Sequence, residues 1–258
     1  MRLKHLIITT TLCCALCSAL SAASPFAGKW KLNQAKSHFT GQSDSVTAAG
    51  PNTWKFAYGS FSWTIKADGT DQPTPFGNTW AMKVVNASTW EFTSKIKGKV
   101  TETDTWALSA DGKSMTRTSS GKHENGEAFT NVSTMKRTAG TSGFEGTWET
   151  AELKASFPEL DIEPNGEDGI TLCVPAENVK FSVKFDGKEY PVEGPRIPAG
   201  MTVSAKLVNP RKANATTKLK DKVIDAEEWA VSADGKTFTY TEHDSGVAKP
   251  FVGVYDRM

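Results

Sequence analysis

Trp106-Ala-Leu-Ser-Ala-Asp-Gly-Lys113 recurs 123 residues further along the chain as Trp229-Ala-Val-Ser-Ala-Asp-Gly-Lys236. Near the start of the chain, Gly28-Lys-Trp30 recurs in the same way as Gly146-Thr-Trp148. A repeat that spans more than a hundred residues is a duplicated domain, because solenoid repeats are only about 20 to 50 residues long. The sequence therefore predicts two copies of one domain.

The two units are residues 23–137 and residues 144–258. Between them, residues 138–143 read Thr-Ala-Gly-Thr-Ser-Gly, a composition that is typical of a domain linker. Each unit is large enough to bury one hydrophobic core.

Residues 1–22 have the pattern of a signal peptide. Arg2 and Lys4 give a basic start, and an apolar stretch runs from Leu6 to Leu20. We therefore expect an exported protein that is periplasmic or secreted after cleavage. Three of the four cysteines lie in this segment, so the mature chain keeps only Cys173 and has no intramolecular disulfide.

Both units show the period-two alternation of half-buried strands, as in Trp54, Phe56 and Tyr58. Turn pairs such as Asp111-Gly112 and Asp234-Gly235 interrupt the strands at close intervals. The pattern predicts an all-β fold in which each unit is an antiparallel meander of roughly eight strands. Such a meander closes into an up-and-down barrel to remove its exposed edges, and a β-sandwich is the alternative.

Each unit begins with Gly-x-Trp and ends with an arginine. In a closed meander the first and last strands are neighbours, so the guanidinium can cover the indole and close one end of the barrel. Within the units this predicts the pairs Trp30/Arg137 and Trp148/Arg257.

This placement resembles the lipocalin and wider calycin pattern. The opening stretch from Phe26 to Phe39 and the Asp-Gly-Lys hairpins look like those of small secreted bacterial lipocalin-like domains, here in tandem. The resemblance implies two lipocalin-like barrels in an exported protein, and it implies no chemistry.

The inner positions of the first unit are aromatic, and those of the second unit are smaller. We expect a non-catalytic site for a small apolar or aromatic ligand in a barrel interior, lined by Trp54, Phe56, Trp63, Trp80, Trp90 and Trp106. Two alternatives stay open. The rings could simply fill the first barrel, or Ala213 and Ala215, which align with Trp90 and Phe92, could open a cavity in the second barrel.

Two further hypotheses assign the function elsewhere. In the first, both barrels are filled, and the protein is an interaction module that acts through its surface or through the groove between domains. In the second, the protein is an enzyme with a site at a barrel mouth, where Glu102 or Asp104 lies beside Trp106. That enzyme requires a buried acid with a raised pKa opposite a second polar group.

Other partners and cofactors receive no support from the sequence. The net charge of +1 gives no footprint for nucleic acid, and no second apolar run has the length of a membrane span. No nucleophile elbow, P-loop, dinucleotide fingerprint or zinc spacing is present, so we expect no cofactor. His123 and His243 fall in turn sequences, where polar side chains are usually solvated. The sequence predicts no oligomeric state.

Overall fold

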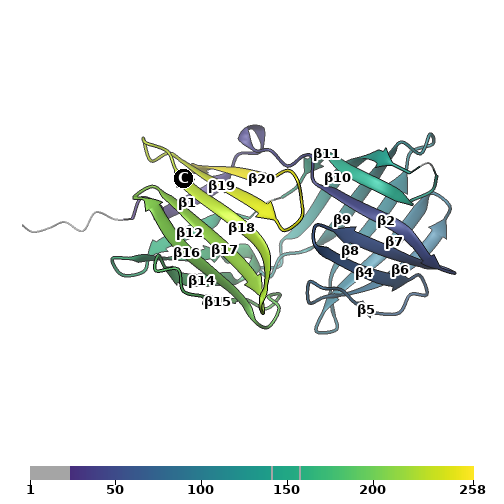
Figure 1. Ribbon diagram of the computed structural model, residues 1–258, viewed down its shortest axis with the longest axis horizontal. Helices are drawn as coiled ribbons and strands as arrows, with labels where there is room; N and C mark the ends of the chain where they lie inside the picture. The colour runs from purple at the N-terminus through teal and green to yellow at the C-terminus, as the bar shows by residue number, and fades with distance from the viewer. Residues whose placement is uncertain (1–23, 141, 157) are drawn as a thin grey trace, which may run out of the picture.

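The computed structural model describes residues 24–140, 142–156 and 158–258, which form two antiparallel barrels side by side (Figure 1). The predicted signal peptide at residues 1–22 lies outside the described residues. The helices of the described part are two short 3-10 turns, η1 (Gln34–Lys36) and η2 (Pro175–Glu177). No helix among these residues is long and apolar enough to cross a membrane.

The first barrel contains ten strands. They are β2 (Ser43–Gly50), β3 (Thr53–Tyr58), β4 (Phe61–Lys66), β5 (Gln72–Pro73), β6 (Thr79–Asn86), β7 (Thr89–Ile96), β8 (Lys99–Leu108), β9 (Ser114–Lys122), β10 (Ala128–Ala139) and β11 (Gly146–Lys154). Their order is β4-β3-β2-β11-β10-β9-β8-β7-β6-β5, without hydrogen bonds between the end strands β4 and β5. Aromatic rings bridge this seam, since the rings of Trp63 on β4 and Trp80 on β6 lie 5.5 Å apart.

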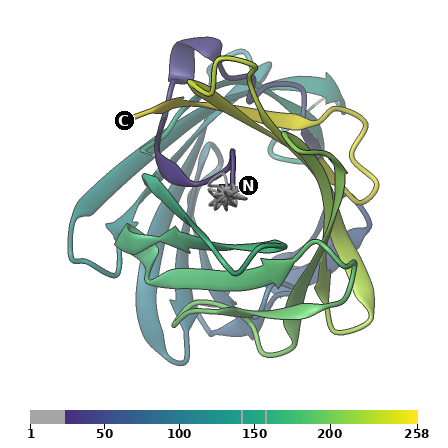
Figure 2. The ribbon, with the colours of Figure 1, turned by 90° about the vertical axis from the view of Figure 1, so that its left-hand side faces the viewer.

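The second barrel also contains ten strands. They are β1 (Gly28–Leu32), β12 (Leu160–Pro164), β13 (Gly169–Val174), β14 (Val179–Lys184), β15 (Tyr190–Glu193), β16 (Met201–Asn209), β17 (Lys212–Leu219), β18 (Lys222–Val231), β19 (Thr237–Asp244) and β20 (Phe251–Arg257). Here the hydrogen bonding is continuous, and the sheet is a closed barrel. Figure 2 looks along its axis and shows the strands around a full circle.

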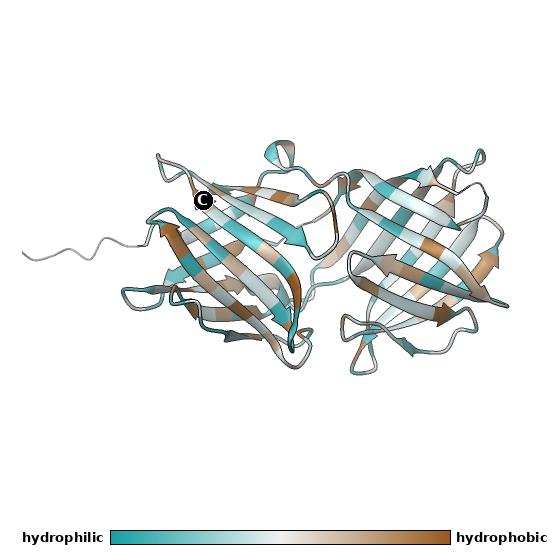
Figure 3. Ribbon diagram, viewed as in Figure 1, coloured by the Kyte–Doolittle hydropathy of each residue, from teal (hydrophilic) through white to brown (hydrophobic). Residues whose placement is uncertain are grey.

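The predicted all-β architecture of two barrels is confirmed, but the number of strands per barrel is ten rather than eight. Two hairpins turn at residues other than glycine. Asn52 and Lys220 take positive φ angles of 49° and 57° in these turns. Along the strands, hydrophobic and hydrophilic residues alternate (Figure 3). Buried hydrophobic side chains form one core in each barrel.

The two barrels exchange their first strands. β1 belongs to the first repeat but pairs with β12 and β20, in the register Trp30↔Arg257. β11 belongs to the second repeat but pairs with β10 and β2, in the register Trp148↔Arg137. The chain therefore passes from one barrel to the other after β1, through residues 33–42, and again between the end of β11 at Lys154 and the start of β12 at Leu160. The barrels in space do not coincide with the repeats in sequence.

The exchange corrects the predicted closure pairs. Arg257 lies over Trp30, and Arg137 lies over Trp148, each with its guanidinium carbon 4.1 Å from the ring centroid. The residue types and roles are as expected, but the pairs Trp30/Arg137 and Trp148/Arg257 are wrong. Because both repeats begin with Gly-x-Trp, either copy of the first strand satisfies either arginine.

Each closed end is tightly built. The indole Nε1 of Trp30 donates to the carbonyl of Phe26 at 2.9 Å, and that of Trp148 donates to the carbonyl of Phe144 at 2.9 Å. Gly28 has a φ of 145°, and a Cβ there would lie 2.2 Å from the guanidinium of Arg257. Glycine before the tryptophan is therefore required so that the arginine can cover the ring.

The opposite ends of the barrels face each other. The β3–β4 loop contacts the β19–β20 loop, where the amide of Ser60 donates to the carbonyl of Ser245 at 2.6 Å. The β9–β10 loop contacts the second barrel through an ion pair of Glu124 with Arg196 at 2.7 Å. His123 lies in this contact with Nδ1 against Glu177, and its side chain is only 9% exposed. The expectation of a solvated turn is therefore wrong for His123, because the second barrel covers it.

Candidate functional site

The six aromatic residues predicted to line a site come together in the first barrel. Phe56 lies at the centre of the cluster, with ring centroids 5.8 Å from Trp63, 5.8 Å from Trp80 and 5.9 Å from Trp106. Trp54 and Trp90 form a second group of the cluster at 4.7 Å, and Trp90 stacks on Phe144 at 4.0 Å. Most of this interior is filled by rings.

A small cavity of about 170 Å³ remains at the facing end of the first barrel. Phe56, Trp63, Trp80 and Trp106 line it together with Arg117. Trp54 and Trp90 do not line this cavity and pack in the core. The structure thus brings four of the six predicted residues to one cavity, and the other two support them.

The second barrel holds a larger cavity, of about 300 Å³, at its own facing end. Its apolar wall includes Leu172, Val174, Phe181, Val192, Met201 and Val203. Four of these align with Trp54, Phe56, Trp63 and Trp80 of the first repeat. The smaller side chains leave open the space that indole rings occupy in the first barrel. Ala213 and Ala215 are buried in the core, but they do not line the cavity.

One wall of the second cavity carries acids. Asp225, Glu227 and Trp229 alternate inward along β18, and Glu242 follows Tyr240 on the neighbouring strand β19. The Trp229 indole donates to Glu227 Oε2 at 2.6 Å, and the Thr217 hydroxyl donates to Glu227 Oε1 at 2.5 Å. Glu227 is therefore held in place by its neighbours.

The carboxyl group of Asp225 is less fully hydrogen-bonded than that of Glu227. Its side chain is 8% exposed and lines the cavity, and its Oδ1 atom has no hydrogen-bond partner among the described residues. An unpaired oxygen at such a buried position is costly unless some group satisfies it.

Burial raises the pKa of every acid in this wall. It raises the pKa of Asp225 to about 8, and the nearby Glu227 carboxyl adds to the shift. The pKa of Glu242 is likewise raised to about 8 by burial and by the charge of Asp244. Burial also raises the pKa of Glu227. The wall therefore carries protons near neutral pH and releases them in mildly alkaline solution.

The first barrel has an equivalent acid pair. Glu102 and Asp104 align with Asp225 and Glu227, and burial raises the pKa of Asp104 to about 7. Ser119 donates a hydrogen bond to Asp104, so the buried acid and the second polar group that the enzyme hypothesis requires are both present. Here, however, a cation is close by, because Arg117 lies 3.8 Å over the Trp106 ring and pairs with Asp44 at 2.8 Å.

The sequence prediction named Glu102 and Asp104 but missed their counterparts. The repeat alignment places Asp225 and Glu227 two and four positions before Trp229, just as Glu102 and Asp104 precede Trp106. Strand alternation from a buried Trp229 puts both acids inside the barrel. That signal was present in the sequence.

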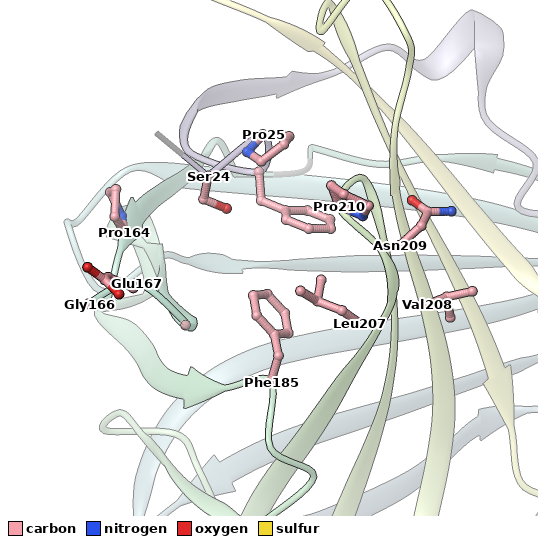
Figure 4. Close-up of a pocket in the computed structure, with 12 residues that line it drawn as sticks. Ser24, Pro25, Pro164, Gly166, Glu167, Phe185, Leu207, Val208, Asn209 and Pro210 are labelled. Carbon is pink, nitrogen blue, oxygen red and sulfur yellow. The ribbon is translucent and has the colours of Figure 1, made fainter. Parts of the chain in front are cut away.

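Two grooves lie outside the barrel interiors. One, of about 540 Å³, lies at the far end of the second barrel beside Pro25, Phe185 and Leu207 (Figure 4). The other, of about 500 Å³, lies between the barrels and is lined by Pro75, Ile96, Arg196, Ile197, Pro198 and Leu219. The groove between the barrels is one of the two places, with the outer surface, where the interaction-module hypothesis puts the site. That hypothesis also expects both barrels to be filled, whereas the second barrel holds a cavity of about 300 Å³.

The described residues contain no group of three or more histidine, cysteine or acidic side chains arranged to hold a metal ion. The lone Cys173 is partly buried, which raises the pKa of its thiol and makes it a poor nucleophile. Comparison of the chain with protein-family models, with curated proteins and with solved structures finds no match.

Proposed function

We propose that this chain is an exported, non-catalytic binding protein that holds a small, largely apolar ligand in the second barrel. The observation that carries the proposal is the cavity of about 300 Å³ between closed-barrel strands, with an apolar wall and a few polar groups on one side. Ligand sites in proteins have this construction and begin at about this volume. Export rests on the signal-peptide pattern of residues 1–22.

The second barrel suits this role better than the first. The cavity in the first barrel measures about 170 Å³, and the aromatic cluster fills the rest of that interior. The resemblance to lipocalin-like domains agrees with a ligand inside a barrel. The first barrel then covers the mouth of the second barrel, because the facing ends of the two barrels are in contact.

The first experiment is native mass spectrometry of the protein purified from its exported fraction, followed by denaturation to release any bound molecule. A matched pair of variants locates the site. Val174→Phe places in the second barrel the residue that the first repeat has at Phe56, and the reciprocal Phe56→Val is the control. We expect Val174→Phe to lose the co-purified molecule and Phe56→Val to retain it. Retention by Val174→Phe at the wild-type level would exclude the second cavity.

A catalytic role is the second candidate, favoured by carboxyl groups with pKa values of about 8 beside a cavity. The same preparation tests it. The recovered molecule is incubated with fresh protein and weighed again by mass spectrometry. A change of its mass that Asp225→Asn abolishes would establish an enzyme, and an unchanged mass supports a binding protein.

A further inference from the structure

Among the described residues, no cation acts strongly on the acid wall of the second barrel. The groups that act most strongly on Asp225, Glu227 and Glu242 in the described structure are acids and neutral hydroxyl or indole donors. Thr217 faces the wall from β17, Tyr240 and Asp244 face it from β19, and Tyr255 faces it from β20. The nearby Lys222 is directed to the first barrel, where its ammonium lies 3.6 Å from the Phe61 ring centroid.

The two repeats differ at two positions that set the net charge beside the acids. Arg117 of the first barrel aligns with Tyr240 of the second, and Ser119 aligns with Glu242. In the first barrel Arg117 pairs with Asp44, and its charge also lowers the pKa of Asp104. The second barrel has a neutral phenol in place of that arginine and Glu242 in place of Ser119, so its wall is suited to a cation from outside the chain.

Two further features fit a cationic group on an apolar body. Asp225 lines the cavity, and its buried Oδ1 atom has no hydrogen-bond partner among the described residues, so a ligand N–H that reaches it would satisfy it. Trp229 and Phe181, stacked at 6.0 Å, and the rings of Tyr240 and Tyr255 line the same space. Aromatic faces attract a desolvated cation.

The volume limits the size of the ligand. A cavity of about 300 Å³ holds roughly ten non-hydrogen atoms, taking about 30 Å³ for each. The opposite wall of leucine, valine and methionine side chains favours a hydrocarbon body rather than a polar one.

Resting on the proposed binding function, we propose that the ligand of the second barrel is a small organic amine. Its protonated nitrogen lies against Asp225 and Glu227, and its hydrocarbon body lies against Leu172, Val174 and Val203.

Three probes of equal chain length test the inference by isothermal titration calorimetry on the full chain. They are octylammonium, 1-octanol and octanoate. At pH 9, where the acids are largely ionised and the amine is still protonated, we expect octylammonium to bind at least about tenfold more tightly than 1-octanol, with octanoate the weakest. From pH 9 to pH 6 the acids take up protons, so the affinity for octylammonium should fall about tenfold or more while that for 1-octanol stays level.

The matched variants are Asp225→Asn and, at the aligned position of the first barrel, Glu102→Gln. We expect Asp225→Asn to lower the affinity for octylammonium to that for 1-octanol, without changing the affinity for 1-octanol. Glu102→Gln should leave the affinities for all three probes unchanged. The near-isosteric asparagine preserves the shape of the wall, and an unchanged affinity for 1-octanol reports that the variant is folded.

The outcomes separate the two proposals. If octylammonium and 1-octanol bind equally, or if octanoate binds best, the cation inference is wrong while the cavity is still a binding site. If no probe binds at either pH, the inference and the proposed function both fail.

Discussion

At the scale of single residues, the closed ends show what a short motif can predict. Gly-x-Trp and a distant arginine correctly predicted a guanidinium over an indole in each barrel. They could not predict the partners, because the glycine, the indole and the arginine are the same in both repeats and local chemistry does not distinguish the copies. The role of the six aromatic residues of the first barrel in ligand binding stays a prediction. Asp225 and Glu227 of the second cavity were missed, although they align with the acids named in the first repeat.

Replacing Arg257 should destabilise the second barrel. Arg257 covers Trp30 and donates to the carbonyls of Gly235 at 2.6 Å, Ala27 at 2.5 Å and Pro25 at 3.0 Å. We expect Arg257→Ala to lower the free energy of unfolding by about 1–2 kcal/mol and to make Trp30 accessible to iodide quenching. The control is Arg257→Ala combined with Trp30→Phe, in which the added quenching should disappear. Added quenching that persists in this control would mean that Arg257 covers another tryptophan.

The raised pKa values of Asp225 and Glu242 predict a pH dependence of stability. A carboxyl whose pKa is higher in the folded protein than in the unfolded chain stabilises the fold at acidic pH, and this contribution is lost as the pH rises toward about 8. We expect calorimetry to show a lower melting temperature at pH 9 than at pH 6. Asp225→Asn should reduce the difference, whereas Glu159→Gln, at an exposed position, should not. An Asp225→Asn profile identical to that of the wild type would contradict the buried, unpaired carboxyl.

At the scale of the elements, the sequence predicted strands and barrels but not their number or their exchange. Alternation and Asp-Gly pairs report local structure, so most hairpins were identified. The turns at Asn52 and Lys220 lack an Asp-Gly pair, and two strands per barrel were missed. The exchange of β1 and β11 depends on whether residues 33–42 fold back or cross to the other barrel, and no local pattern records that choice.

Engineered cysteines can report which barrel contains β1. In the structure Lys31 pairs with Asp256, whereas an unexchanged strand would pair Lys31 with Lys136. In a Cys173→Ser background, we expect Lys31→Cys with Asp256→Cys to form a disulfide under oxidation, because directly paired strand residues have suitable Cα distances. Lys31→Cys with Lys136→Cys should stay reduced, as judged by mass spectrometry after alkylation. The reverse result would show that each repeat keeps its own first strand.

At the scale of the whole molecule, the boundaries of the two barrels differ from the boundaries of the two sequence repeats. The repeats run over residues 23–137 and 144–258, but the first barrel is built from the continuous segment β2 to β11. The second barrel is discontinuous, because it needs β1 from the other end of the chain. A boundary drawn from the repeat alone therefore cuts through a barrel.

Two fragments of similar length test these boundaries. Residues 42–155 contain every strand of the first barrel, whereas residues 24–140 lack β11 and must bend residues 33–42 back to replace it with β1. That bend loses contacts such as the hydrogen bond from Asn33 to Asp256 at 2.7 Å. We expect residues 42–155 to unfold cooperatively in urea and at a higher midpoint than residues 24–140. Equal or reversed midpoints would show that the repeat is the folding unit.

The strand exchange also constrains the order in which the parts of the chain fold. β1 is the first strand to be synthesised, but its neighbour β20 at residues 251–257 is the last. Contacts between such distant segments form late, because the long loop that they close carries a large entropic cost. A chain that stops before residue 251 leaves Trp30 without the strand and the arginine that cover it. In the exchanged arrangement, β1 is therefore covered only once β20 has joined the second barrel.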